Sequence, residues 1–98
     1  MAADAVKAAP NLYKVLFENN KVRVLETRYK AKDKSAMHSH PALVACFIKQ
    51  GKGKFTLPDG KTQEMEAKAG DAVFMDAQTH AVENIGNTEL HVILVELK

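Results

Sequence analysis

The sequence predicts an all-β domain, either a sandwich or a small barrel. Apolar and polar residues alternate over many short segments, as in strands with one buried face. Gly, Asn and Pro recur between these segments, at residues 19–20, 58–60 and 86–87, and these residues tolerate the backbone angles of tight turns. No segment shows the ~3.6-residue period of an amphipathic helix. About seven to nine short strands with turns between them are typical of a sandwich or barrel.

The apolar segments predict the strands in chain order. Residues 12–18 and 21–29 are joined by two asparagines, so we expect a first hairpin. A continuous apolar run at 43–49 predicts a strand buried on both faces. Gly51 and Gly53 are expected to turn this strand into the next one. Apart from the short segment that contains His38 and His40, the predicted strands are residues 12–18, 21–29, 43–49, 54–57, 61–67, 71–76, 80–85 and 89–97.

The length of 98 residues corresponds to one domain, and a content of 46% apolar and 27% charged residues is that of a globular chain. Residues 1–10 are rich in alanine and end at Pro10. We expect them to form an N-terminal arm that is either frayed or packed on a partner subunit. Residues 11–98 are expected to form the β-barrel domain.

Charge and hydropathy exclude several classes of partner. The formal net charge of +2 comes from lysines spread along the chain without a basic cluster, so we expect no nucleic-acid partner. No apolar run approaches the ~20 residues that span a bilayer, and the first residues lack the pattern of a secretion signal. We therefore expect a cytoplasmic protein with no membrane partner. Cys46 is the only cysteine, so no intrachain disulfide forms, and we expect its side chain to be buried.

Two histidines one residue apart, His38 and His40, are the first candidate functional residues. Side chains alternate between faces along a strand, so both imidazoles would lie on one side, roughly 7 Å apart. A metal-binding pair on a helix needs a wider spacing, as in H-E-x-x-H. His80 can complete a three-nitrogen face for one metal ion. The alternative is that the pair lies in an exposed loop beside Pro41 and has no function.

Strand parity predicts what lies beside this histidine pair. If the strand continues regularly from His40, the side chains of Val44, Cys46 and Ile48 share the face of the two histidines. We therefore expect these three residues to line an apolar pocket at the site.

Two segments of the chain carry a distinctive order of residues, His38-x-His40 with Gly51 and Gly70 with His80-x-x-x-Asn84. This order resembles the two motifs of the cupin family. The first family motif reads approximately H-x-H, three or four residues, Glu, six residues and Gly, and the second begins with Gly and ends in H-x-x-x-N. The resemblance runs from about Val22 to Glu96 and implies a small cupin-like β-barrel, a double-stranded β-helix or jelly roll. Residues 82–96 are also loosely similar to small bacterial cupins of the β-alanine-degradation type.

The chain departs from the family motifs in three places. The position of the usual glutamate ligand falls on Val44, so that carboxylate is missing. The Pro and Gly of the second motif fall on Asp76 and Gln78, and the turn before His80 is one residue short. Three neutral imidazoles leave the full charge on a divalent metal ion, which favours anionic, chelating ligands.

The resemblance implies one divalent metal ion, Fe, Zn, Ni or Mn, held by His38, His40 and His80. Three-histidine cupin sites resemble those used for thiol and diketone oxygenation. This similarity implies a metal-dependent, dioxygenase-like oxidoreductase that acts on a small polar or anionic substrate. The alternative is a non-catalytic module that binds a small molecule or a metal, because a fold by itself does not determine a reaction.

Other polar residues near the motifs have open roles. Gln78 would share the face of His80, where it is either a weak fourth ligand or a contact to substrate, or else an exposed turn residue. Asp76 and Glu83 either orient a histidine ring or lie at the surface. His91 lies among alternating apolar residues, which favours a core or dimer-interface histidine over a metal ligand.

The last strand predicts the oligomeric state. A barrel this small leaves its outer sheet edges exposed, together with apolar strands such as residues 92–97. Pairing two copies across a two-fold axis covers both, so we expect a homodimer.

Overall fold

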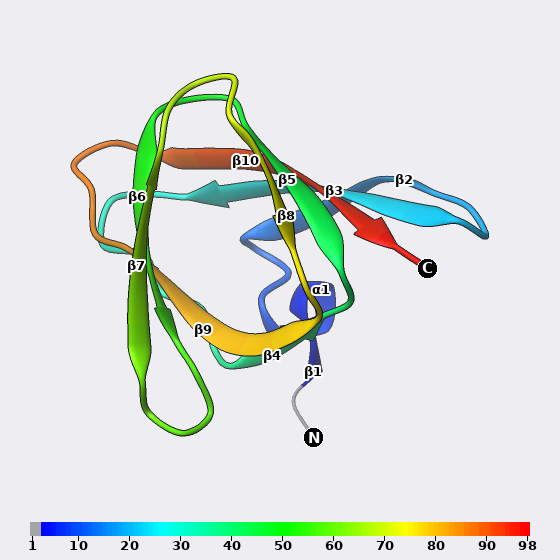
Figure 1. Ribbon diagram of the computed structural model, residues 1–98, viewed down its shortest axis with the longest axis horizontal. Helices are drawn as coiled ribbons and strands as arrows, with labels where there is room; N and C mark the ends of the chain where they lie inside the picture. Colours follow the sequence, from blue (N-terminus) through cyan, green and yellow to red (C-terminus); the bar gives the residue numbers. More distant parts are fainter. Residues whose placement is uncertain (1–2) are drawn as a thin grey trace.

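The computed structural model describes residues 3–98, which form a β-barrel of two five-stranded sheets (Figure 1). Its elements are β1 (Ala3–Asp4), α1 (Ala5–Ala8), β2 (Tyr13–Glu18), β3 (Val22–Tyr29), β4 (His38–His40), β5 (Leu43–Phe47), β6 (Gly51–Thr56), β7 (Thr62–Ala67), β8 (Ala72–Met75), β9 (Gln78–Asn84) and β10 (Leu90–Leu97). One sheet has the strand order β1-β4-β9-β6-β7, and the other has the order β2-β3-β10-β5-β8. The predicted all-β jelly-roll fold is confirmed.

Sequence neighbours lie in different sheets at two places that matter for the site. β4 and β5 are separated by only two residues, yet β4 pairs with β9 and β5 pairs with β10 and β8. β8 and β9 also follow each other in the chain and lie in different sheets. The chain therefore crosses from one sheet to the other within a few residues. In Figure 1, the β2–β3 hairpin projects beyond the barrel, beside the C-terminus.

Two details of the predicted strands were wrong. β5 alternates between the interior and the outer face and is not buried on both, because only one side of its sheet faces the barrel interior. Gly51 and Gly53 lie inside β6 and not in a turn. A Cβ atom at Gly51 would lie 2.4 Å from Cδ1 of Leu90, so glycine is needed there for the close approach of a buried side chain.

The N-terminal segment packs on the barrel of its own chain, so the prediction of a frayed arm was wrong for the described residues, while packing on a partner subunit stays a prediction. Ala3 pairs with His38 in a parallel register, and Ala5 and Ala9 are buried in the core. The Asp4 carboxylate caps α1 by accepting a hydrogen bond from the Val6 amide at 3.1 Å. Burial of two alanines and this cap hold the segment against β4. Residues 1–2 of the predicted arm lie outside the described part.

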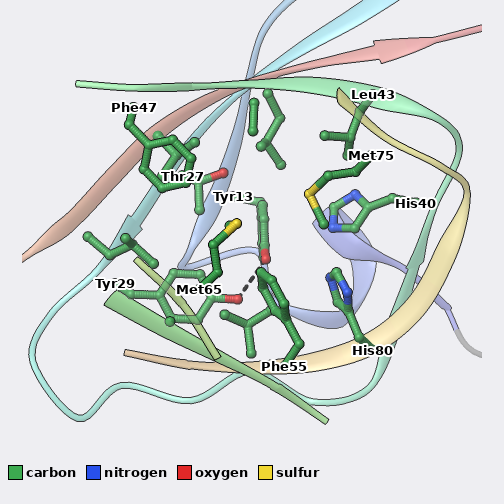
Figure 2. Close-up of a pocket in the computed structure, with 16 residues that line it drawn as sticks. Tyr13, Thr27, Tyr29, His40, Leu43, Phe47, Phe55, Met65, Met75 and His80 are labelled. Atoms are coloured by element: carbon green, nitrogen blue, oxygen red, sulfur yellow. Dashed lines mark hydrogen bonds between the residues drawn. The ribbon is translucent and has the colours of Figure 1, made fainter. Parts of the chain in front are cut away.

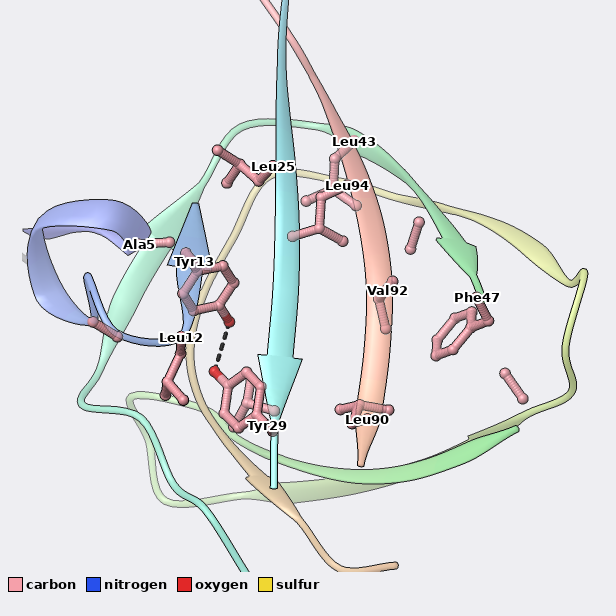
Figure 3. Close-up of a cluster of buried hydrophobic side chains, with 14 residues drawn as sticks. Ala5, Leu12, Tyr13, Leu25, Tyr29, Leu43, Phe47, Leu90, Val92 and Leu94 are labelled. Carbon is pink, nitrogen blue, oxygen red and sulfur yellow. Dashed lines mark hydrogen bonds between the residues drawn. The ribbon is translucent and has the colours of Figure 1, made fainter. Parts of the chain in front are cut away.

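Apolar side chains from both sheets fill the barrel (Figure 3). They come mainly from alternate positions of β3, β5 and β10, because residues two apart on a strand share a face. Leu25 and Tyr29 are completely buried. In residues 3–98, no helix has the length and apolar character needed to cross a membrane.

Asn84 joins three segments at the end of β9. Its side chain is 1% exposed. The amide nitrogen donates to the carbonyl oxygens of Tyr29 at 3.0 Å and Thr88 at 2.8 Å, and the amide oxygen accepts from the Gly86 amide at 2.9 Å. This one side chain therefore satisfies backbone groups at the end of β3 and in the turn before β10.

Replacing Asn84 with alanine should lower the free energy of unfolding by about 2–3 kcal/mol, because buried backbone groups lose their partners. Urea unfolding measures the change. Asn87→Ala is the matched control, since Asn87 is exposed in the same turn, and it should change stability by no more than about 0.5 kcal/mol. Equal effects of the two substitutions would contradict this role for Asn84.

Candidate metal centre

Three histidines from two neighbouring strands meet inside one end of the barrel. His38 and His40 lie on β4, and His80 lies on β9 directly opposite His38 in the antiparallel register. The three side chains are 0%, 6% and 4% exposed, respectively. One nitrogen from each ring lies within 4.8 Å of the others. The structure thus brings together the three residues that the sequence analysis identified as ligands.

Each of the three rings is oriented by a hydrogen bond at its Nδ1 atom. The contacts are His38 Nδ1 to the carbonyl oxygen of Ala36 at 2.8 Å, His40 Nδ1 to Oε2 of Glu96 at 2.7 Å, and His80 Nδ1 to Oε1 of Gln78 at 2.7 Å. Carbonyl, carboxylate and amide oxygens only accept, so each Nδ1 donates its proton. With Nδ1 as the protonated nitrogen, Nε2 of a neutral ring carries a lone pair, which is the form that binds a metal.

Burial keeps the rings of His38 and His80 neutral. Burial lowers the pKa of His38. Burial also lowers the pKa of His80 to about 3, with a further contribution from repulsion by His38 and His40. The Phe55 ring stacks on His80 with a centroid distance of 4.9 Å and an interplanar angle of 8°, which covers one face of the imidazole. At neutral pH, protons therefore do not compete with a cation for His38 and His80.

Glu96 is a functional residue that the sequence analysis missed. Its carboxylate is 2% exposed and bridges His40 to Arg23, whose Nε donates to Oε1 at 2.7 Å. Arg23 is also paired with Asp4 of the N-terminal segment. A signal was present in the sequence, since Glu96 has the same parity on the last strand as the apolar residues Leu94 and Val92, and a carboxylate at an inward position needs a partner.

Two tyrosine hydroxyls reach the histidine cluster from the opposite sheet, and they too were missed. The Tyr13 oxygen lies 3.2 Å from Nε2 of His38 and 2.6 Å from the Tyr29 oxygen (Figures 2 and 3). Because Nε2 of His38 accepts, the Tyr13 hydroxyl donates a hydrogen bond to it. The Tyr13 oxygen in turn accepts a hydrogen bond from the Tyr29 hydroxyl. Burial raises the pKa of both hydroxyls, so they remain protonated donors.

A cavity of about 60 Å³ extends from the histidines into the barrel. Figure 2 shows His40 and His80 on one side of it, with Thr27, Tyr29 and Phe47 on the other. Apolar side chains form most of the wall. The lining residues from β5 are Leu43, Ala45 and Phe47.

The predicted pocket lining of Val44, Cys46 and Ile48 was wrong. The prediction assumed that side chains keep alternating between faces from His40 through residues 41–42 into β5. The chain crosses from one sheet to the other at these two residues, so the alternation starts again at β5. Val44 and Cys46 are half-buried on the outer face, so Cys46 is not fully buried as expected, and Ile48 is 48% exposed. The four-residue spacing of the first motif falls on Ala45, which does line the cavity.

Gln78 orients His80 through the Nδ1 contact and does not belong to the three-nitrogen cluster. The carboxylate that orients a ring is Glu96, and neither Asp76 nor Glu83 has that role. Asp76 lines a separate surface hollow. Glu83 on β9 lies opposite Lys54 of β6 in the strand register.

His91 lies outside the cavity, on the outer face of its sheet. Its Nε2 atom is 3.0 Å from Oε2 of Glu26 on the neighbouring strand. Side chains alternate between the two faces along β10, so His91 points to the outer face while its neighbours Leu90 and Val92 point into the barrel. The expectation of a core histidine was therefore wrong, while the expectation that His91 is not one of the clustered residues agrees with the structure.

Comparisons with known proteins agree with this architecture. The family described as Cupin domain matches residues 25–96. The structure of a cupin domain from Bordetella pertussis is 21% identical and has a TM-score of 0.80, with 100% of this chain and 97% of that chain covered. A conserved protein with a double-stranded β-helix domain from Klebsiella pneumoniae subsp. pneumoniae is 22% identical, with a TM-score of 0.69 and coverages of 88% and 75%. At these identities the likeness shows the fold alone. No curated protein matches the chain.

Acid should destabilise the metal-free protein through His80. Its pKa is about 3 in the folded chain and 6.5 for an ordinary imidazole, so between these values the unfolded chain binds a proton that the folded chain excludes. The free energy of unfolding should fall as the pH drops through this window, with a slope that approaches ~1.4 kcal/mol per pH unit. Urea unfolding of chelator-treated protein at several pH values measures this slope.

His80→Gln removes this titration and should give a shallower dependence on pH than the wild type over the same window. His91→Gln is the control for the loss of a histidine outside the cavity. Parallel curves for the wild type and His80→Gln would show that the buried ring does not resist protonation.

Proposed function

The chain belongs to the cupin domain family, and on this basis we propose that His38, His40 and His80 hold one divalent metal ion, Fe, Zn, Ni or Mn. The observation that carries the proposal is the commitment of all three Nδ1 atoms to oxygen acceptors. It makes Nε2 the ligand atom of each ring and holds the rings in place. Nε2 of His38 accepts from Tyr13 in the metal-free protein, and a bound metal ion would displace that donor. Neutral imidazole suits Fe, Zn and Ni, whereas Mn prefers oxygen ligands.

The donor set determines the kind of ligand that such a centre accepts. Glu96 shares its charge with Arg23 and reaches the site only through the ring of His40. No histidine carries a negative charge, so the positive charge of a bound cation is not cancelled by its ligands. When bound, the metal ion supplies a Lewis-acid centre that attracts an anionic, chelating group of a small molecule.

We further propose that the protein is a dioxygenase-like oxidoreductase that acts on a small molecule with an anionic end. Molecular oxygen is the oxidant, and both of its atoms enter the product. The chain would contribute burial of the reacting end, orientation by the histidines and a protonated donor at Tyr13, whose hydroxyl lies 3.2 Å from Nε2 of His38. Phe55 and the apolar wall would exclude water from the cavity.

One observation favours a second function, a non-catalytic module that binds a small molecule or a metal. Burial raises the pKa of Tyr13 and Tyr29, so neither hydroxyl serves as a base near neutral pH. No carboxylate belongs to the described cavity wall. A reaction that needs proton abstraction by the protein therefore has no obvious base there.

Loading with Fe(II) under anaerobic conditions should give one metal ion per chain, measured after removal of excess metal. His80→Ala should weaken metal binding by at least ~10-fold, because one of three nitrogen ligands is lost. His91→Ala, on the outer face, should retain the metal. A wild-type protein that retains no metal would overturn the proposed centre.

The choice between enzyme and binding module is made by oxygen uptake of the iron-loaded protein with a panel of thiols, diketones and short acids. The oxygenase proposal expects uptake with at least one compound, and no uptake by His80→Ala. Binding of a panel compound without uptake would favour the non-catalytic module.

We also propose that the protein forms a homodimer through the outer face of the sheet that contains β10. The residues in one row across all five strands are Phe17, Val24, Val95, Val44 and Phe74 in spatial order. Phe17 and Phe74, at the two edge strands, are 54% and 57% exposed. The order of residue types in this row, Phe-Val-Val-Val-Phe, is the same in both directions. A two-fold axis that runs along β10 at Val95 would therefore place Phe17 of one copy against Phe74 of the other. Self-complementarity of this kind is what a symmetric dimer requires.

Phe74→Glu should convert a wild-type dimer to a monomer, because it places a charge in the apolar row of both copies. Light scattering at micromolar concentration measures the mass. Gln63→Glu is the control, since Gln63 is exposed on β7 of the other sheet. A wild-type monomer at this concentration would contradict the dimer.

A further inference from the structure

Thr27 is the one buried side chain of residues 3–98 that has a polar atom without a hydrogen-bond partner. It is 4% exposed, lies on β3 and lines the cavity. An unpartnered buried hydroxyl lowers stability. Valine has nearly the same shape and would fill this position without that loss. A hydroxyl here therefore indicates a partner that enters the cavity from outside the chain.

A water molecule is a poor partner for Thr27. A buried water usually needs two to four polar contacts. The wall around the cavity is mostly apolar, and the hydroxyls of Tyr13 and Tyr29 bond to each other and to His38. A ligand with its own apolar body avoids this problem, because it brings one polar atom to Thr27 and covers the apolar wall with carbon.

Apart from the hydroxyls of Tyr13 and Tyr29, which are bonded to each other and to His38, the polar groups of the described wall lie in two places. His40 and His80 lie on one side of the cavity, and Thr27 lies on the other, next to Phe47 and Tyr29 (Figure 2). No lysine or arginine belongs to this wall. A second anionic group deep in the cavity would therefore be buried without a cation, which is strongly unfavourable.

We propose that the cavity takes a small monoanion with a short apolar body, whose anionic end lies at the histidines and whose far end carries a neutral hydrogen-bonding group for Thr27. The volume of about 60 Å³ limits the ligand to a short chain. A neutral hydroxyl, carbonyl or amide fits the far end. This proposal rests on the proposed metal centre for the anionic end, while the selection at Thr27 is a property of the wall alone.

Three short acids test the proposal by titration calorimetry on the metal-loaded protein. 4-Hydroxybutanoate has the expected far hydroxyl, butanoate lacks it, and succinate carries a second charge in its place. 4-Hydroxybutanoate should bind about three- to tenfold more tightly than butanoate. Succinate should bind at least ~10-fold more weakly than 4-hydroxybutanoate.

Thr27→Val should abolish the preference for 4-hydroxybutanoate over butanoate and leave metal content unchanged. Thr56→Val is the control, since Thr56 lies on β6 and does not line the cavity, and it should keep the preference. Equal binding of the two acids by the metal-loaded wild type, or an unchanged preference in Thr27→Val, would overturn the inference and leave the metal centre standing.

A second measurement does not depend on the metal. In chelator-treated protein, Thr27→Val should keep or raise the melting temperature, because it removes an unpartnered buried hydroxyl. A clear fall in melting temperature would show that the hydroxyl is bonded within the empty protein, and it would overturn the inference whatever the metal does. If the wild type holds no metal, the proposed function fails, and this measurement still decides the role of Thr27.

Discussion

The antiparallel pairing of β4 with β9 is the constraint on which the whole site depends. It places His38 opposite His80 and His40 opposite Gln78. Gln78 lies two residues before His80 on β9, and its Oε1 atom is 2.7 Å from Nδ1 of His80. If β4 were shifted by one residue against β9, the rings of His38 and His40 would point to the outer face of the sheet, away from His80. Strand pairing, and not any single side chain, therefore assembles the three nitrogens.

A chain of hydrogen-bonded side chains, buried at Glu96, supports this arrangement from the other sheet. It runs from His40 to Glu96, Arg23 and Asp4, and so it joins the histidine cluster to the N-terminal segment. Burying charges is costly unless they are paired and hydrogen-bonded. Here each carboxylate is paired with Arg23, and Glu96 also accepts from a histidine. The N-terminal segment is thus part of the site's support, because Asp4 pairs with the arginine that holds Glu96.

The interior of the barrel is divided into a polar part and an apolar part. Histidines and tyrosine hydroxyls gather where the two sheets are joined by Tyr13, and apolar side chains from β5, β6 and β10 surround the remaining space. The division follows from the strands, since alternate residues on each strand face inward and only β4 and β9 carry histidine at those positions. A ligand in this space meets a cation-binding group at one side and carbon over most of its length.

The sequence alone determined the all-β class, most strand positions and the three clustered histidines, because alternation, turn residues and motif spacing are local properties of the chain. It did not determine which residues of β5 face the cavity, since the chain changes sheets at residues 41–42 and parity cannot be carried across that break. Nor did it identify Glu96 or Tyr13 as partners of His40 and His38. Those contacts join residues 56 and 25 positions apart in the chain, and only the closure of two sheets around one interior brings them together.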